Sequence, residues 1–141
     1  MMPLVTLILA LLSGGVPAQV TFTTIAEGQQ SNVEDLREVI VRSAAEWKTL
    51  WQQHAPDQPM PKVDFAKSMV IGVFLGSRST GGYRATISAV DRDGAGLVVT
   101  WREERPGPDA IVSQMLTFPY HVVRVDRSSG PVKFRRATAP G

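Results

Sequence analysis

The 141-residue sequence predicts an α+β domain, mainly antiparallel β, with one short N-terminal helix packed on a sheet of about six to eight strands. Alternating and β-branched runs recur along the chain, separated by turns that contain glycine or proline. One early segment carries apolar residues at helical spacing, and no internal repeat is visible. The length and the 43% hydrophobic content fit one ordinary globular domain with no second domain.

Residues Met1–Ala18 have the pattern of a secretory signal peptide. Leu4–Leu12 is an apolar run of the right length for the h-region and is short for a bilayer span. Val16 and Ala18 fit the −3 and −1 positions of a cleavage site. The n-region has no lysine or arginine, so an uncleaved anchor is the alternative. Both readings place the single domain, residues 19–141, in an extracytoplasmic location: periplasm, cell surface or secreted.

The first elements of the domain are predicted to be two strands and the helix. Gln19–Ala26 alternates threonines with apolar residues, and Glu38–Arg42 is short and β-branched. Ser43 and Glu46 form a capping box, in which each side chain satisfies a free amide of the first helical turn. We therefore expect a helix that begins after Ser43 and ends at Ala55–Asp57.

The helix carries Trp47, Leu50 and Trp51 at i, i+3, i+4 spacing, which favours two indoles packed on the sheet over a ligand platform. The proline-containing Gln58–Lys62 is expected to be a surface linker. Asp64 is placed to cap the short turn that follows, a structural role.

Met69–Ala89 is predicted to be the central β-hairpin of the domain. Met69–Leu75 is apolar at nearly every position, so both of its faces should be buried in mid-sheet. Ser77–Gly82 would be the tip of the hairpin. Tyr83–Val90 then alternates, which is typical of a half-solvated antiparallel strand with Tyr83, Ala85, Ile87 and Ala89 on one face.

The remaining strands follow in close succession. Gly96–Glu104 and Ile111–Thr117 are predicted strands, separated by a charged loop with two prolines. Pro119 interrupts the ladder, and Tyr120–Asp126 continues it, with a bulge as one possible join. Pro131–Arg136 is the last expected strand.

The inventory of residue types excludes several kinds of site. The chain has no cysteine, which rules out disulfides, thiolate metal ligands, a cysteine nucleophile and a lipid-modified N-terminal cysteine as anchor. His54 and His121 are its two histidines, too few for a typical multi-histidine zinc site, so we expect no metal and no cofactor. The net charge is +2 and basic residues are hardly clustered, with Lys133–Arg136 the nearest to a cluster, which argues against nucleic acid.

The glycine-rich segment Gly76–Gly82 fits neither a phosphate loop nor a serine elbow. A Walker loop needs Gly-Lys-Ser/Thr leading into a helix, and here the lysine is missing and a strand follows. G-x-S-x-G fails because Arg78 stands two residues after Gly76. Arg78 itself has two open roles: it grips a partner, or it ties the loop internally to Asp64, Asp109 or Glu103.

Several segments together carry a family resemblance. Glu46-Trp47…Leu50-Trp51, Val63-Asp64-Phe65, Gly76-Ser-Arg-Ser-Thr-Gly-Gly-Tyr83, Pro106-Gly107-Pro108 and Thr117-Phe118-Pro119 occur in this order. The chain resembles the PrcB C-terminal domain family over about Val39–Phe134. The resemblance implies a non-catalytic accessory domain that helps assemble or stabilise a bacterial surface protease complex.

The resulting first hypothesis is a secreted, non-enzymatic binding or assembly module with an extracytoplasmic protease or another envelope protein as partner. Its candidate partner-binding residues are Arg78, Ser79, Thr80, Gly81, Gly82 and Tyr83. Its structural residues are Ser43, Glu46, Trp47, Trp51, Asp64 and Pro119. The alternative is a small hydrolase or carbohydrate-active enzyme that uses His121 with an acidic partner. A purely structural envelope protein is the third possibility.

Overall fold

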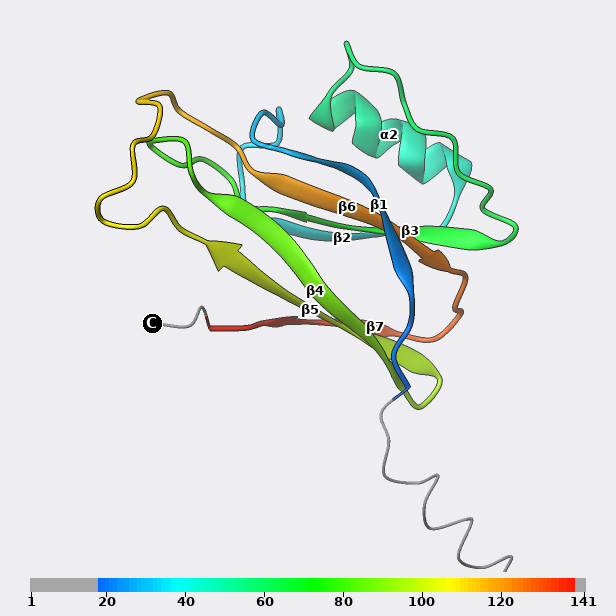
Figure 1. Cartoon of the computed structure of the whole chain (residues 1–141). Coiled ribbons are helices and arrows are strands. Elements are labelled where there is room, and N and C mark those ends of the chain that lie inside the picture. The colour runs from blue at the N-terminus through cyan, green and yellow to red at the C-terminus, as the bar shows by residue number, and fades with distance from the viewer. Residues whose placement is uncertain (1–17, 139–141) are drawn as a thin grey trace, which may run out of the picture.

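The domain consists of two β-sheets that face each other, with the helix on the outer face of one of them (Figure 1). The computed structural model describes residues 18–138, so the predicted signal peptide lies outside the described residues except for Ala18. The elements are β1 (Phe22–Gly28), β2 (Arg37–Val41), α2 (Ala44–His54), β3 (Ser68–Phe74), β4 (Arg84–Asp93), β5 (Gly96–Glu104), β6 (Tyr120–Asp126) and β7 (Val132–Arg136).

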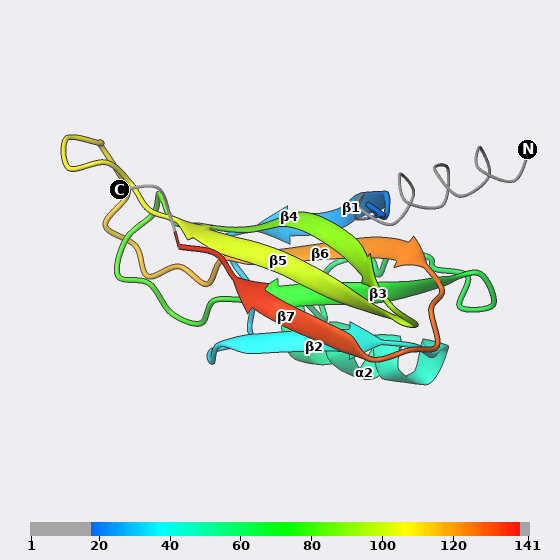
Figure 2. The same ribbon diagram turned by 90° about the horizontal axis from the view of Figure 1, so that it is seen from below.

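One sheet has four strands in the order β1-β6-β3-β2, and the other has three in the order β4-β5-β7. The pairs are antiparallel except β5 and β7, which run parallel. The predicted class, α+β and mainly antiparallel with one short helix, is confirmed. The strands divide into two sheets, however, where one sheet was expected. Figure 2 shows the three-stranded sheet crossing in front of the four-stranded one.

Strand β3 contributes side chains to both hydrophobic layers, one between the two sheets and one between the four-stranded sheet and α2. Met69, Ile71 and Val73 point into the core between the sheets, and Val70 and Phe74 point toward α2. All five side chains are fully buried. This confirms that the continuous apolar run of β3 needs cover on both faces.

Helix α2 begins and packs as its sequence predicts. As predicted, the Ser43 hydroxyl oxygen accepts a hydrogen bond from the amide of Glu46 at 3.2 Å. Glu46 Oε1 instead accepts from the amide of Arg42 at 3.1 Å, one residue before the helix cap. Trp47 and Trp51 are buried in the layer between helix and sheet. Their indole N–H groups donate to the carbonyls of Pro61 and Gln58, both at 2.9 Å, and so fasten the proline-containing linker beneath the helix.

Asp64 and Pro119 also have structural roles. Asp64 Oδ1 accepts from the amide of Ala66 at 3.0 Å and closes the turn before β3. Pro119 directly precedes β6, and its carbonyl accepts from the amide of Leu75 at 3.0 Å. A proline fits there because its carbonyl is the group that is used.

The predicted central hairpin is wrong. β3 and β4 lie in different sheets, and the segment between them crosses from one sheet to the other. β3 has antiparallel neighbours on both edges, β2 and β6, because a strand with two apolar faces is stable in mid-sheet. β4 has one solvated face and pairs with β5 instead.

The predicted face of β4 is correct only in its first half. Ala85 and Ile87 are buried, but a bulge between Ile87 and Ala89 shifts the register. Val90 therefore points into the core, and Ala89 is half-buried. An extra residue in one strand exchanges its faces from that point on, which alternation counting cannot anticipate.

Two other predicted strands differ from the structure. Ile111–Thr117 is an irregular loop with one bridge, between Thr117 and Arg78. Gln19–Ala26 is divided between the sheets: Gln19 bridges Asp91 on β4, and the rest enters β1 beside β6. Both stretches are rich in apolar residues and contain no glycine or proline, which is why strands were predicted there. Whether such a stretch forms a strand depends on a neighbouring strand with which it can pair.

Replacing Trp47 with phenylalanine tests the fastening of the linker. Trp47→Phe keeps an aromatic ring in the core but leaves the Pro61 carbonyl without its donor. We expect the free energy of unfolding in urea to fall by about 1–2 kcal/mol. Thr49→Ala, on the exposed side of the same helix, is the control and should change it by less than about 0.5 kcal/mol. Equal values for the two variants would contradict the role of the indole.

Candidate functional site

The candidate site is the end of the domain where two loops meet, residues 76–83 and 105–119, called the loop end below. The first connects β3 to β4 and the second connects β5 to β6. Arg78 and Thr117 exchange backbone hydrogen bonds at 2.7 and 2.8 Å, and the amide of Gly81 donates to the carbonyl of Ser113 at 2.9 Å. The Thr117 hydroxyl also donates to the carbonyl of Thr80 at 2.8 Å. The two loops therefore form one connected unit.

The double glycine makes this contact possible. Gly82 has a φ of +91°, in the left-handed region that favours glycine, and a Cβ there would lie 2.8 Å from side-chain atoms of Pro106 and Val112. A Cβ on Gly81 would lie 2.8 Å from the Ser113 hydroxyl oxygen. The glycines thus serve the packing of one loop against the other.

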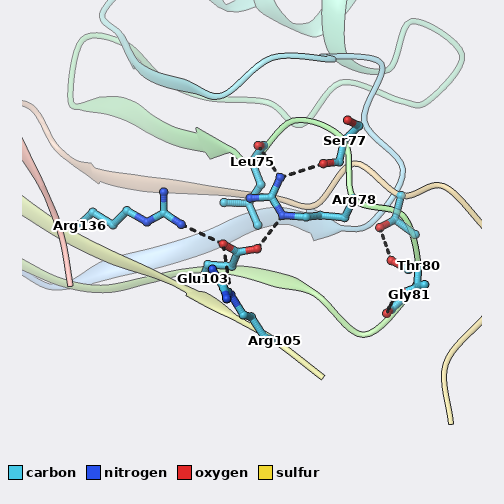
Figure 3. A network of polar contacts seen from close by, with 9 residues as sticks. Leu75, Ser77, Arg78, Thr80, Gly81, Glu103, Arg105 and Arg136 are labelled. Atoms are coloured by element: carbon cyan, nitrogen blue, oxygen red, sulfur yellow. Dashed lines mark hydrogen bonds and ion pairs between the residues drawn. The ribbon is translucent and has the colours of Figure 1, made fainter. Parts of the chain in front are cut away.

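Arg78 is bound within the domain (Figure 3). Its Nε donates to Glu103 Oε2 at 2.6 Å, and its Nη1 donates to the carbonyls of Leu75 and Ser77 at 3.2 and 2.8 Å. Of the two roles left open by the sequence, the structure shows the internal ion pair, with Glu103 as its acceptor. The arginine holds the loop in place.

Glu103 is a buried carboxylate surrounded by cations. Its side chain is 6% exposed, Arg136 Nη2 lies 2.8 Å from Oε1, and Arg105 Nε lies 3.9 Å from the same oxygen. The hydrogen bond from Arg78 is the main cause that lowers the pKa of Glu103, and the charges of the three arginines add to it against the opposing effect of burial. Glu103 is therefore an ionised anchor.

The other predicted contact residues differ in accessibility. Ser79 and Gly82 are exposed, Thr80 and Tyr83 are half-buried, and Gly81 is buried. Thr80 donates its hydroxyl to the carbonyl of Gly81 at 2.9 Å. The guanidinium carbon of Arg78 lies 5.9 Å from the centroid of the Tyr83 ring. The structure thus brings all six candidates to the loop end but offers mainly Ser79 and Gly82 to solvent.

Sequence reasoning missed the most exposed apolar side chains of the loop end. Ile111 is 102% exposed, Met115 62% and Leu116 56%. They were assigned to a strand, where an apolar residue would be expected to pack. Pro106 and Pro108 on one side and Pro119 on the other were the available signal that this stretch is a loop.

His121 joins the two sheets. Its Nδ1 accepts a hydrogen bond from the amide of Ile87 on β4 at 2.8 Å, and its Nε2 lies 2.8 Å from the Thr24 hydroxyl on β1. Because an amide can only donate, Nδ1 carries the lone pair and the ring proton is on Nε2. A nitrogen that already carries a proton cannot take one from Thr24. The lone pair of His121 is thus already engaged, and the ring joins β6 to both β4 and β1.

His54 is the other buried histidine. Its Nδ1 lies 2.7 Å from the Ser31 hydroxyl, which in turn accepts from the amide of Val33. Its ring is 1% exposed and packs against Trp51 and Tyr120, which denies a substrate access to the pair. Burial lowers the pKa of His54 and of His121, and in His121 the charge of Glu27 partly opposes this.

Among residues 18–138, no group of three or more histidine, aspartate or glutamate side chains is placed to hold a metal ion. The helix there is too short and too polar to be a membrane span.

The fold and the loop end define a small two-sheet α+β domain with an internally fastened loop and an exposed apolar surface. Residues 69–126 match the family model described as PrcB C-terminal. The match runs from β3 to the end of β6 and contains the Gly76–Tyr83 string, although it is narrower than Val39–Phe134. Comparisons with curated proteins and with solved structures gave no match.

Removing Arg78 tests the internal role of that side chain. Arg78→Ala leaves Glu103 buried without its shortest hydrogen bond, so we expect the free energy of unfolding to fall by about 2 kcal/mol. Arg84→Ala is the matched control, because its ion pairs are 3.7 and 3.8 Å long and its side chain is 59% exposed. The control should cost less than about 0.5 kcal/mol in the same denaturation series. A cost for Arg78→Ala no larger than that of Arg84→Ala would contradict the assignment.

The buried histidines predict a loss of stability in mild acid. Both have a pKa below the ordinary 6.5 in the folded state, so the unfolded chain binds more protons as the pH falls below about 6.5. The stability that the two neutral histidines contribute is complete above that pH. It is lost as the pH falls toward their lower pKa values in the folded state. Melting temperatures should therefore fall from pH 7.5 to pH 5.

The double variant His54→Asn, His121→Asn isolates this effect. An amide side chain keeps a hydrogen-bonding group in each place but does not titrate in this range. Its melting temperature should vary much less between pH 7.5 and pH 5. A double variant with the same pH slope as the native chain would show that other groups cause it.

Proposed function

We propose that this chain is a non-catalytic binding and assembly module that acts outside the cytoplasm. The proposed partner is a protein of the envelope, and the contact surface is the loop end. The observation that carries the proposal is the exposure of Ile111, Met115 and Leu116 on one short segment. Large apolar side chains that gather on a surface mark sites of protein association, whereas single ones are ordinary.

The loop end is also organised for binding. Ser113, within the segment Ile111–Leu116, and Thr117, directly after it, are fixed by backbone hydrogen bonds to Gly81 and Arg78. Arg78 in turn is held by Glu103. A surface that is already ordered loses little conformational entropy when a partner binds. These hydrogen bonds therefore hold in place the backbone that carries Ile111, Met115 and Leu116.

The match of residues 69–126 to the PrcB C-terminal family model supports the class of partner. The family resemblance implies an accessory domain of a bacterial surface protease complex, so an extracytoplasmic protease is the first candidate. The hydrogen bonds of His121 support a non-enzymatic reading, since both of its nitrogens serve to join the sheets. The loop end thus provides a binding surface in place of a catalytic one.

Affinity capture from the native envelope, after crosslinking, tests the proposal. The native chain should capture a specific extracytoplasmic protein, and the triple variant Ile111→Ser, Met115→Ser, Leu116→Ser should capture it about tenfold less or worse. Met60→Ser is the matched control, because Met60 is an exposed apolar residue in the linker after α2. Undiminished capture by the triple variant would remove the loop end from the interface. Hydrolytic activity that is abolished by His121→Ala at an unchanged melting temperature would instead favour the enzyme.

A further inference from the structure

Strand β2 is the edge of the four-stranded sheet, and its outer side is open. It pairs with β3 without any irregularity from Arg37↔Phe74 to Val41↔Val70. Among residues 18–138, no strand pairs with its other side, and no backbone hydrogen bond outside the β2–β3 ladder involves Arg37–Val41. Figure 2 shows β2 at the border of the molecule, with α2 behind it. Half of the backbone groups of β2 thus face away from the sheet.

The other three edge strands of the described sheets carry features that discourage pairing. β1 has a bulge between Thr24 and Ala26. β4 has a bulge, and its outer side is occupied where Val20 donates to the Val90 carbonyl and the Ile87 amide donates to His121. β7 carries three basic residues in five, Lys133, Arg135 and Arg136. Bulges, cover and basic side chains are the usual ways in which proteins protect an edge.

β2 has neither a bulge nor a proline, and in the described part of the chain no strand covers its outer side. Its one basic residue, Arg37 at the first position, is bound to Asp35 and Gln53. Its acidic residue Glu38 does not extend outward, because its carboxylate accepts a hydrogen bond from the Trp101 indole at 2.7 Å. Arg42, just after the strand, is likewise turned inward and donates to the carbonyls of Ser128 and Gly130. An unprotected regular edge is a template for another extended strand.

An apolar groove runs beside this edge. A cavity of about 380 Å³ lies between β2 and α2, lined by Val39 and Val41 of the strand, Ala45 and Leu50 of the helix, and polar side chains at its rim. A strand added to β2 would place every second side chain against this groove. The occupant therefore needs small apolar residues at alternate positions.

A second copy of β2 meets this requirement. In an antiparallel pair centred on Ile40, Val39 of each copy lies opposite Val41 of the other, on the face that carries the groove. On the other face Glu38 of each copy stands opposite Arg42 of the other, so no like charges meet across the twofold axis while both side chains keep their contacts within their own copy. A register centred on Val39 would instead place the charged Arg37 opposite the apolar Val41.

We propose that two copies of this chain associate through their β2 strands, antiparallel about a twofold axis at Ile40, to form one continuous eight-stranded sheet with both α2 helices on one face. This interface is separate from the loop end, and neither proposal depends on the other.

Opposite charges introduced at the axis give the main test. By light scattering after gel filtration, the native chain should have twice the mass of one copy. Ile40→Lys alone and Ile40→Glu alone should each reduce the mass to that of one copy, because like charges then face each other at the axis. A mixture of the two variants should restore the doubled mass. Ser88→Lys, on the exposed face of β4 in the other sheet, is the control and should remain a dimer.

A single introduced cysteine tests the register. The chain has no cysteine, so Ile40→Cys is its only thiol. Directly opposed residues of antiparallel strands lie within disulfide range. Mild oxidation should therefore convert Ile40→Cys to a covalent dimer, and Ser88→Cys should react much less.

Three results would overturn the proposal. The first is a native chain that has the mass of one copy at about 100 µM, a concentration at which weak specific dimers form. If the β2 amides then become protected from hydrogen exchange only when another protein is added, the edge binds a strand of that protein. The second is a dimer that survives both charge variants. The third is a mixture of Ile40→Lys and Ile40→Glu that stays monomeric although each variant keeps the native circular dichroism and melts cooperatively.

Discussion

The organisation of the loop end depends on the ionised carboxylate of Glu103. A buried charge is costly unless several donors compensate it, and here the donors come from distant parts of the chain: Arg78 from the loop after β3 and Arg136 from β7. The guanidinium of Arg136 also lies 4.9 Å from the centroid of the Trp101 ring. The Trp101 indole in turn reaches Glu38 on β2 in the other sheet. One buried carboxylate thus connects the loop end to β5, β7 and, through Trp101, to the facing sheet.

The two sheets are joined at opposite sides by different means. On one side Trp101 and Glu38 link β5 to β2, and on the other His121 links β6 to β4. Between them lies β3, whose alternate side chains supply both hydrophobic layers. The polar links are few and directional, and the apolar layers supply the bulk of the burial. Substitution of Glu38 or His121 should therefore change how the two sheets are placed relative to each other more than it affects whether either sheet forms.

Local patterns in the sequence predicted local structure well. The helix cap at Ser43, the indoles of α2 and the two-faced apolar run of β3 each depend on residues close in sequence, and each is confirmed. The hairpin failed because strand pairing is a long-range choice: nothing in Met69–Ala89 shows that β6 will take the edge of β3. Arg78 could be singled out from its glycine-rich surroundings, but Glu103 was one of three acids that might have bound it. Ile111–Leu116 was missed because apolar content predicts burial, and exposure depends on what packs nearby.

The two proposed surfaces have a definite geometrical relation. The loop end lies at the Arg37 end of β2, since Arg37 pairs with Phe74, the last residue of β3, and the loop follows two residues later. Strands that pair antiparallel run in opposite directions. A dimer through β2 would therefore place its two loop ends far apart and facing opposite ways. Such a dimer could bind two partners at once, and it would gain avidity only for partners whose own spacing matches that span.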